Sequence, residues 1–318
     1  MAAKVSEIEE VSTPAPHAFT KRYSAKFRRA DNGRTLSERR CKKRAFLGRE
    51  NQLEGEKMAY SKDQIIKQIE DLGIQKNDII LVHSSMKSIG EVENGAETVL
   101  DAFIEYLNAG LLIFPTHTWA KINEEYNIFN PMTEPSCVGL LSNLFMKRPG
   151  VFRSWHPTHS VAALGEGAEE YVRGEEKSDT PCHRNGCWGK LYDIGAKILF
   201  VGCSLRSNTI IHGVEEWNKI PMRLTDNYQP LKIQTPDGKL LERPLRTHNH
   251  RFGDISENYD KIEDALLKNG IAKLGRIGDA KTYSCDARKM VDLVTSFLKR
   301  NPDIFADKTP IPTEWYYT

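Results

Sequence analysis

The sequence lacks any long hydrophobic run. No stretch of the 318 residues approaches the ~18 consecutive apolar residues that a membrane-spanning helix requires. The hydrophobic fraction of 39% is sufficient for a packed core but is low for a membrane protein. We therefore expect a protein that folds around a hydrophobic core and has no membrane partner.

Cysteine is also scarce and irregularly placed. The 6 cysteines are too few and too scattered to form a disulfide scaffold in a chain of 318 residues. Neither CxxC nor HExxH occurs, and Cys182, His183 and Cys187 fit no standard zinc spacing. The glycine spacing of a phosphate-binding P-loop is absent as well. This pattern predicts reduced thiols, a cytoplasmic location and no bound metal.

Neither sign of charge dominates the whole chain, but the charges are unevenly distributed. Residues 1–57 carry 14 Lys/Arg against 8 Asp/Glu, and they include the run RRCKKR at 39–44. By subtraction from the totals of 45 and 43, the rest of the chain carries 31 against 35. A basic run can bind nucleic acid or a membrane surface, but a solvated tail is the simpler interpretation. We expect residues 1–57 to be a disordered extension with no nucleic-acid partner and no part in catalysis.

Hydrophobic periodicity predicts an α/β fold for residues 58–318. Ser61 and Gln64 have the spacing of a capping box, and Asn94 is placed to cap a later helix. Short apolar runs are typical of strands buried on both faces, and those runs cover 79–83, 111–116, 160–165 and 196–204. Helical patterns cover 61–72, 96–108, 138–146, 168–173, 209–217, 262–269 and 286–300. We expect one domain with a mostly parallel central sheet and an added β-hairpin around 236–238.

A loop of small residues follows the first predicted strand. HSSMKSIG (His83–Gly90) would lie at the carboxyl end of that strand, where ligands bind in open parallel sheets. Serine hydroxyls and glycine allow backbone amides to approach a ligand closely, and Lys87 adds charge for a phosphate. An ordinary strand-to-helix loop with solvated serines is the alternative.

The stretch TIIHGVEEW (Thr209–Trp217) places three polar residues on one face of a predicted helix. Thr209, His212 and Glu215 are three residues apart, and helical neighbours at this spacing share a face. A carboxylate beside the imidazole, either Glu215 or Glu216, would fix its tautomer, and a helix start favours the neutral, proton-accepting ring. His212 therefore has the properties of a general base, although a partly buried histidine of an amphipathic helix is an equally common arrangement.

Two further stretches are rich in histidine. His156 and His159 flank Pro157 in WHPTH, and Pro157 disfavours the helical geometry in which zinc pairs usually occur. THNHRFGD (247–254) adds His248 and His250, and such a tract is either a metal site or a polar loop. A metal-dependent hydrolase that uses His156, His159 and His248 or His250 is thus an alternative enzyme class.

Five stretches in collinear order resemble the aminoglycoside N(3)-acetyltransferase family. They are LVHSSMKSIGEVENGAETVLDAF, LLIFPTHTW, RSWHPTHSVAALGEGA, KILFVGCSLRSNTIIHGVEE and RTHNHRF. The similarity extends from about Ala59 to Arg300. It implies a three-layer α/β/α domain and an acetyltransferase that uses acetyl-coenzyme A as co-substrate and no metal.

The resemblance also implies roles for individual residues. His212 would be the general base, Glu215 its carboxylate partner and Thr209 a donor to the oxyanion. His156 and His159 would support the acetyl or acceptor site. Coenzyme A would contact the loop after the first strand, at His83, Ser84, Ser85, Ser88 and Gly90.

The acceptor implied by the resemblance is the 3-amino group of an aminoglycoside, as in antibiotic resistance, or a related amino sugar. An aminoglycoside is polycationic, so its pocket should be acidic. The carboxylates available for it are Glu124, Glu125, Glu175, Glu176 and Asp179, although acidic clusters are usually only solvated faces. A non-catalytic or divergent member that binds coenzyme A and a non-antibiotic amine is the alternative, and the resemblance is compatible with a homodimer.

Overall fold

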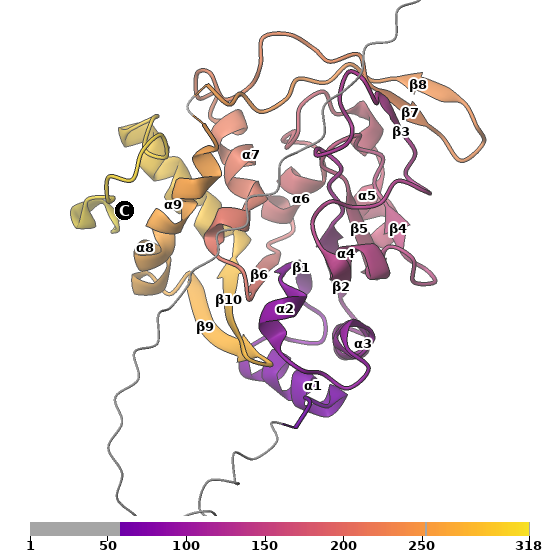
Figure 1. Ribbon diagram of the computed structural model, residues 1–318. Helices are drawn as coiled ribbons and strands as arrows, with labels where there is room; N and C mark the ends of the chain where they lie inside the picture. The colour runs from indigo at the N-terminus through magenta and orange to yellow at the C-terminus, as the bar shows by residue number, and fades with distance from the viewer. Residues whose placement is uncertain (1–57, 252, 318) are drawn as a thin grey trace, which may run out of the picture. The chain divides into compact units, whose positions relative to one another are not determined.

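The computed structural model describes residues 58–251 and 253–317. The expectation of a disordered extension at 1–57 therefore falls outside the described residues. In the described part the chain forms a seven-stranded sheet, a smaller three-stranded sheet and helices that pack on the larger sheet (Figure 1).

The large sheet is mixed rather than mostly parallel. Its strand order is β4-β5-β2-β1-β6-β10-β9. The two parallel pairings of this sheet join the central strand β1 to β2 on one side and to β6 on the other. The four outer pairings are antiparallel. The strands are β1 (Ile79–Ser84), β2 (Leu111–Pro115), β4 (Phe152–Arg153), β5 (Val161–Gly165), β6 (Lys197–Val201), β9 (Ala272–Ile277) and β10 (Ala280–Asp286). The prediction of a mostly parallel sheet was wrong because an apolar run indicates burial and not strand direction.

Helices cover both faces of this sheet (Figure 1). Side chains of successive strand residues point to opposite faces, so Ile80 and Val82 of β1 enter one core while Leu81 enters the other. The first core packs against α1 (Lys62–Asp71), α3 (Ala96–Tyr106) and α4 (Leu140–Phe145). The second packs against α5 (Ala168–Val172), α6 (Cys187–Asp193), α7 (Thr209–Trp217), α8 (Glu263–Lys268) and α9 (Ala287–Arg300). The strands are therefore buried on both faces, as their apolar sequence predicts.

The predicted β-hairpin is present and belongs to a small second sheet. β7 (Lys232–Gln234) and β8 (Leu240–Glu242) pair antiparallel around the turn at 236–238. β3 (Ile128–Phe129) pairs in parallel with β7, although the two are about a hundred residues apart in the chain. Phe129 and Ile233 are fully buried in a separate small core. The irregular segment after β2 is thereby joined to the hairpin.

Two predicted helix starts have different outcomes. The capping box of α1 is confirmed, because Ser61 accepts from the Gln64 N–H and Gln64 accepts from the Ser61 N–H. The predicted cap of α3 at Asn94 is wrong, since the N-cap residue is Gly95 at φ 63° and no side chain caps the helix. Glycine adopts this backbone conformation at little cost. The N-cap therefore lies one residue after the predicted Asn94.

Several elements were not predicted from the sequence. The strands β9 and β10 form a hairpin whose short turn contains Gly278 and Asp279. The helix α6 and the short helix α2 (Met86–Ile89) were also missed. The 3-10 segments of the described residues are η1 (Glu175–Lys177), η2 (Leu205–Ser207), η3 (Ile255–Ile262) and η4 (Thr313–Trp315). The short helices have too few residues for a clear periodic signal, whereas polar residues interrupt the apolar pattern of β9 and β10.

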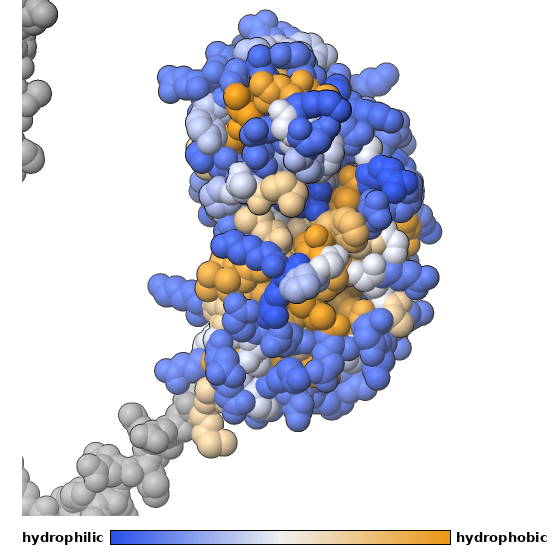
Figure 2. Space-filling view, turned by 90° about the vertical axis from the view of Figure 1, so that its right-hand side faces the viewer, coloured by the Kyte–Doolittle hydropathy of each residue, from blue (hydrophilic) through white to orange (hydrophobic). Residues whose placement is uncertain are grey.

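Within the described residues, no helix combines the length and the hydrophobicity needed to cross a membrane. Some large hydrophobic side chains are nevertheless exposed, among them Ile128, Leu140 and Phe152. Figure 2 shows one face on which hydrophobic residues gather near the middle and hydrophilic residues surround them. Exposed hydrophobic residues of this extent are common on folded domains.

Candidate active site

The carboxyl ends of the three parallel strands open onto one cavity of about 550 Å³. His83 and Ser84 at the end of β1 line it, as does His117, which follows β2. Thr209 and His212 of α7 enter the wall from the segment after β6. The cavity therefore lies where α/β sheets usually bind ligands.

His212 is held by a tyrosine that the sequence analysis did not identify. The Tyr259 hydroxyl lies 2.8 Å from Nδ1 of His212 and also donates to Oε2 of Glu215 at 2.8 Å. Nδ1 of His212 and Oε2 of Glu215 are themselves 3.8 Å apart. The carboxylate partner predicted from the helix spacing is thus present, but its hydrogen bond to the imidazole runs through Tyr259.

This arrangement determines the tautomer of His212. The single hydroxyl proton of Tyr259 is donated to Glu215, because an ionised carboxylate can only accept. The tyrosine oxygen must then accept from Nδ1–H of His212. The other ring nitrogen, Nε2, is left with its lone pair, and the ring lines the cavity. His212 can therefore accept a proton from a molecule in the cavity.

Glu215 is buried and its charge is balanced by an arginine. Nε of Arg223 donates to Oε1 of Glu215 at 2.8 Å, and both side chains are almost fully buried. Burial raises the pKa of Glu215, and the Arg223 guanidinium opposes that rise. Arg223 also donates to the Pro302 carbonyl at 2.9 Å and to Asp303 at 3.1 Å, which fixes the guanidinium in place.

Four histidine rings follow one another along the cavity wall. The His212 and His248 rings stack at a centroid distance of 4.2 Å, His248 lies 5.0 Å from His159, and His159 lies 4.7 Å from His117. Burial holds the pKa of His212, His159 and His117 well below the ordinary histidine range. These three rings are therefore neutral at physiological pH.

His83 and His117 carry ring nitrogens without a partner. Burial lowers the pKa of His83 to about 3, and its ring stacks on Phe200 at 5.2 Å. Within residues 58–251 and 253–317, Nε2 of His83 and Nε2 of His117 have no hydrogen-bond partner. Other atoms of both side chains line the cavity, whereas these two nitrogens are themselves buried.

The two histidines around Pro157 differ in their surroundings. His156 is fully buried, and its Nδ1 accepts from the backbone N–H of Thr158 at 3.1 Å and of His159 at 2.9 Å. Its proton therefore lies on Nε2, which donates to the Thr180 carbonyl at 3.0 Å. His156 holds the loop together, whereas His159 lines the cavity.

The predicted coenzyme loop is divided by the structure. His83 and Ser84 line the cavity, but Ser85, Ser88 and Gly90 do not. The hydroxyl of Ser88 is 2.9 Å from both the Ser85 hydroxyl and the Gly202 carbonyl, so it ties the start of α2 to the end of β6. Gly90 ends α2 at φ 86°, and a Cβ there would lie 2.2 Å from Oδ2 of Asp279. Contact of these three residues with coenzyme A stays a prediction.

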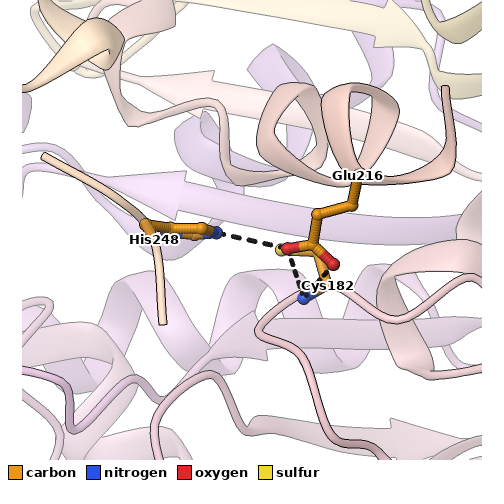
Figure 3. Close-up of side chains that lie close together, drawn as sticks. All are labelled: Cys182, Glu216 and His248. Carbon is orange, nitrogen blue, oxygen red and sulfur yellow. Dashed lines mark hydrogen bonds and ion pairs between the residues drawn. The ribbon is translucent and has the colours of Figure 1, made fainter. Parts of the chain in front are cut away.

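One group of side chains has the spacing to hold a metal ion. A ligand atom from each of Cys182, Glu216 and His248 lies within 4.8 Å of the others (Figure 3). Glu216 is already engaged, since it accepts from the Cys182 N–H at 3.1 Å and pairs with Nε2 of His248 at 3.3 Å. Burial raises the pKa of the Cys182 thiol well above its usual range, which disfavours the thiolate that a metal needs. These contacts fit a hydrogen-bonded group that orients His248 beside His212.

The acidic residues expected around a polycationic acceptor do not line the cavity. Glu175 is buried elsewhere, where its Oε2 accepts from the Cys187 N–H at 2.5 Å. Glu124, Glu125, Glu176 and Asp179 also lie outside the wall. None of the five available carboxylates therefore lines the cavity, and Glu124 and Glu125 are exposed, as the alternative of a solvated acidic face predicts.

Sequence reasoning missed Tyr259, Arg223 and His117 as site residues. His117 could have been found, because it follows β2 in the way that His83 ends β1. Tyr259 is 47 residues from His212 along the chain, and no local spacing relates the two. Arg223 likewise follows its helix in an irregular segment.

Comparison with known proteins identifies the fold and the family. The family model for aminoglycoside 3-N-acetyltransferases matches residues 81–299, which is more than half of the chain. The chain belongs to this family of acetyltransferases. The resemblance inferred from the five sequence stretches is thereby confirmed.

Among its relatives is aminoglycoside N(3)-acetyltransferase IV of Salmonella sp, which is 27% identical over 250 residues, or 77% of this chain and 90% of the relative. Aminoglycoside N(3)-acetyltransferase III of Salmonella sp is 25% identical over 269 residues, or 76% of this chain and 92% of that protein.

The fold of this family member is similar to that of solved acetyltransferases. The crystal structure of a mutant of aminoglycoside acetyltransferase AAC(3)-IVa in complex with a gentamicin is 25% identical, with a TM-score of 0.69, and covers 78% of this chain and 92% of that one. The structure of AAC-IIIb in its binary complex with CoASH is 20% identical, with a TM-score of 0.68, and covers 80% and 100%.

Proposed function

We propose that this chain transfers the acetyl group of acetyl-coenzyme A directly to an amine of an aminoglycoside or a related amino sugar, with His212 as the general base. Residues 58–318 would form the catalytic domain. The observation that carries the proposal is the 2.8 Å contact between Tyr259 and Nδ1 of His212, which leaves a neutral imidazole with a free Nε2 in the cavity wall. A general base at neutral pH needs that protonation state.

The reaction follows from the position of this base. The acceptor enters as a neutral amine and its nitrogen attacks the carbonyl carbon of the acetyl thioester. Nε2 of His212 takes the proton that the nitrogen loses as the C–N bond forms. The tetrahedral intermediate then collapses, the C–S bond breaks and the coenzyme leaves as a thiolate, which receives the proton from the imidazolium. Binding both substrates in one cavity supplies the orientation that direct transfer requires.

Glu215 and Tyr259 would stabilise the imidazolium during this reaction. Positive charge develops on the His212 ring as it takes the proton, and the Glu215 carboxylate lies 3.8 Å from Nδ1. Tyr259 transmits this interaction through its two hydrogen bonds of 2.8 Å. Arg223 positions the carboxylate from the opposite side. Each of the three is thus a positioning residue for the base.

Thr209 is proposed as a donor to the oxyanion of the tetrahedral intermediate. It lines the cavity in the first turn of α7, one helical turn before His212. The positive end of the helix dipole favours negative charge at this position. Removing one oxyanion donor typically costs ~2.7–4 kcal/mol of transition-state stabilisation.

The relatives support the same chemistry. The crystal structures include a family enzyme in complex with a gentamicin and another with CoASH. We assign the corresponding roles here to the cavity walls, with the coenzyme approaching along the β1 end at His83 and Ser84. His159 would support the acetyl group or the acceptor from the neighbouring wall.

The proposal is tested by measuring thiol release from acetyl-coenzyme A with a panel of aminoglycosides and amino sugars. We expect turnover with at least one amine, and mass spectrometry should find one added acetyl group. His212→Ala should lower kcat by about 10²- to 10⁴-fold. His183→Gln is the matched control, because His183 does not line the cavity and should leave kcat unchanged. Activity that survives His212→Ala within a factor of two would overturn the assignment of the base.

A further inference from the structure

The charge of the cavity wall bears on the acceptor. Among the lining residues in the described ranges, Asp254 is the one that carries a carboxylate and Arg206 is the one Lys or Arg. Arg206 donates to Glu257 at 3.1 Å. Asp254 accepts from the Ser256 N–H at 3.0 Å and from the Ser256 hydroxyl at 2.6 Å. The wall therefore offers a cation one carboxylate, and that carboxylate is partly engaged.

The two carboxylates near His212 already have partners. Glu215 is bonded to Arg223 and Tyr259 and is fully buried. Glu216 accepts from the Cys182 N–H and pairs with His248. Glu124 and Glu125 follow Asn123, which lines the wall, but both are exposed and lie outside it. None of these four side chains stands in the wall to pair with a second ammonium group.

A polycationic acceptor fits such a wall poorly. Each ammonium group that leaves water needs a carboxylate, because a desolvated charge without a partner costs several kcal/mol. An aminoglycoside such as gentamicin carries several amines, and protonation of the histidines would only add repulsion. The cavity thus matches an acceptor whose reacting amine is its single basic group.

The groups that do line the cavity suit hydroxyls and an apolar ring face. The wall carries uncharged polar side chains that can bond hydroxyl groups, among them Asn123, Gln229 and Thr247. Trp119 lines the wall with 53% of its surface exposed, and the buried Ile122 lies beside it in the lining. An aromatic side chain of this kind packs against the apolar face of a sugar ring.

We propose that the acceptor is a monoamino sugar, with one basic amine on a hydroxyl-rich ring, and that the enzyme discriminates against polycationic aminoglycosides. This inference rests on the proposed acetyl transfer. Uncharged polar side chains of the wall bind hydroxyls of the acceptor, Trp119 packs on its ring, and the single amine reaches His212 and loses its proton there.

The first experiment compares acceptors that differ in charge, and it includes a diamino sugar of the same ring size as the monoamino sugars. Thiol release from acetyl-coenzyme A is measured at one ionic strength with 2-amino-, 3-amino- and 6-amino-glucose, with 2,6-diamino-2,6-dideoxyglucose and with gentamicin. We expect kcat/KM for the diamine and for gentamicin to be at least tenfold below that of the best monoamine. Equal or better turnover of the diamine or of gentamicin would overturn the inference while supporting the proposed acetyl transfer.

The second experiment adds negative charge to the wall without changing its shape. Asn123→Asp and Gln229→Glu are combined, since both side chains line the cavity. The Oδ1 atom of Asn123 accepts from the N–H groups of Glu125 and Tyr126, and an aspartate preserves both bonds. We expect the ratio of kcat/KM for gentamicin to that for the best monoamine to rise at least tenfold. A ratio within twofold of the wild-type value would contradict charge as the discriminating property.

A third measurement separates the two proposals. If no amine releases thiol, the proposed acetyl transfer is wrong, and calorimetric titration of the protein–coenzyme A complex still tests the charge preference. Binding of a monoamino sugar at least tenfold tighter than gentamicin supports the inference, and tighter binding of gentamicin overturns it.

Discussion

At the scale of single residues, the chemistry of His212 depends on its partners. The ring is partly buried, and its Nδ1 proton is held by Tyr259. Without that hydrogen bond the ring could adopt either tautomer, and part of its population would present a protonated Nε2 to the amine. Tyr259 is therefore the residue on which the proposed base depends most directly.

Tyr259→Phe tests this dependence. The variant keeps the ring packing against Phe305 but removes the hydroxyl between His212 and Glu215. We expect kcat to fall by about 10- to 100-fold, with a smaller change in KM, because a positioning residue acts on the transition state. Tyr228→Phe is the control, since Tyr228 does not line the cavity. A kcat within twofold of wild type in Tyr259→Phe would show that Tyr259 does not position the base.

His156 is expected to matter more for stability than for the rate. Its two ring nitrogens satisfy the N–H groups of Thr158 and His159 and the Thr180 carbonyl in a fully buried site. His156→Ala should lower the free energy of unfolding by about 1–3 kcal/mol, measured by urea denaturation. His156→Ala and His159→Ala should each lower kcat less than His212→Ala. An equal or greater loss of kcat at either position would mean that His212 is the wrong histidine for the base.

At the scale of elements, close packing around Gly90 fixes the C-terminal end of the short helix α2. Gly90 has φ 86° and lies so close to Asp279 that a Cβ would meet Oδ2 at 2.2 Å. Ser88 joins the same turn to Gly202. The loop after β1 is thereby packed against the β9–β10 turn and the end of β6, so the predicted coenzyme loop is held rigidly at the edge of the cavity.

Gly90→Ala should destabilise this element by both strain and steric conflict. We expect a loss of about 1–3 kcal/mol in the free energy of unfolding, together with a higher KM for acetyl-coenzyme A. Gly95→Ala is the matched control, because Gly95 has φ 63° but nothing within 4 Å of an added Cβ. A loss in Gly90→Ala no larger than that in Gly95→Ala would mean that the contact with Asp279 contributes nothing.

The elements also show which features could be predicted locally. The helix α7 has the predicted bounds, Thr209–Trp217, because its apolar stripe and its limits are local properties. The hairpin β9–β10 was missed even though a Gly-Asp turn separates its strands, since the strand residues Lys273, Arg276 and Lys281 interrupt the apolar pattern. The antiparallel pairing of β5 with β2 could not be predicted from either strand alone.

At the scale of the whole molecule, buried histidines make folding sensitive to acid. Burial lowers the pKa of His83 to about 3, lowers that of His156, and holds the pKa of His117, His159 and His212 well below the ordinary value. In the unfolded chain these groups titrate near ~6.5. Below that pH the unfolded state binds more protons than the folded state, so stability is fully present above ~6.5 and is lost as the pH falls.

We expect the free energy of unfolding to fall steeply between about pH 6.5 and about pH 5, by up to ~1.4 kcal/mol per pH unit for each such histidine. His83→Phe removes one of these titrating groups, so it should make the slope shallower by about one proton. Phenylalanine suits the position because the His83 ring already stacks on Phe200. Urea denaturation across this pH range measures the slope, and the same slope in His83→Phe and wild type would contradict the prediction.

Local sequence was enough to establish the family, the two-faced burial of the central strands, and the position of His212 on a helix after a buried strand. The family was indicated by the resemblance of five stretches, and the other two features by short-range periodicity and spacing. The direction of the outer strands, the row of histidines, the Tyr259 bridge and the near absence of carboxylates from the described cavity wall emerged only in the folded chain. Those features depend on contacts between residues far apart in the chain, for which local sequence carries no signal.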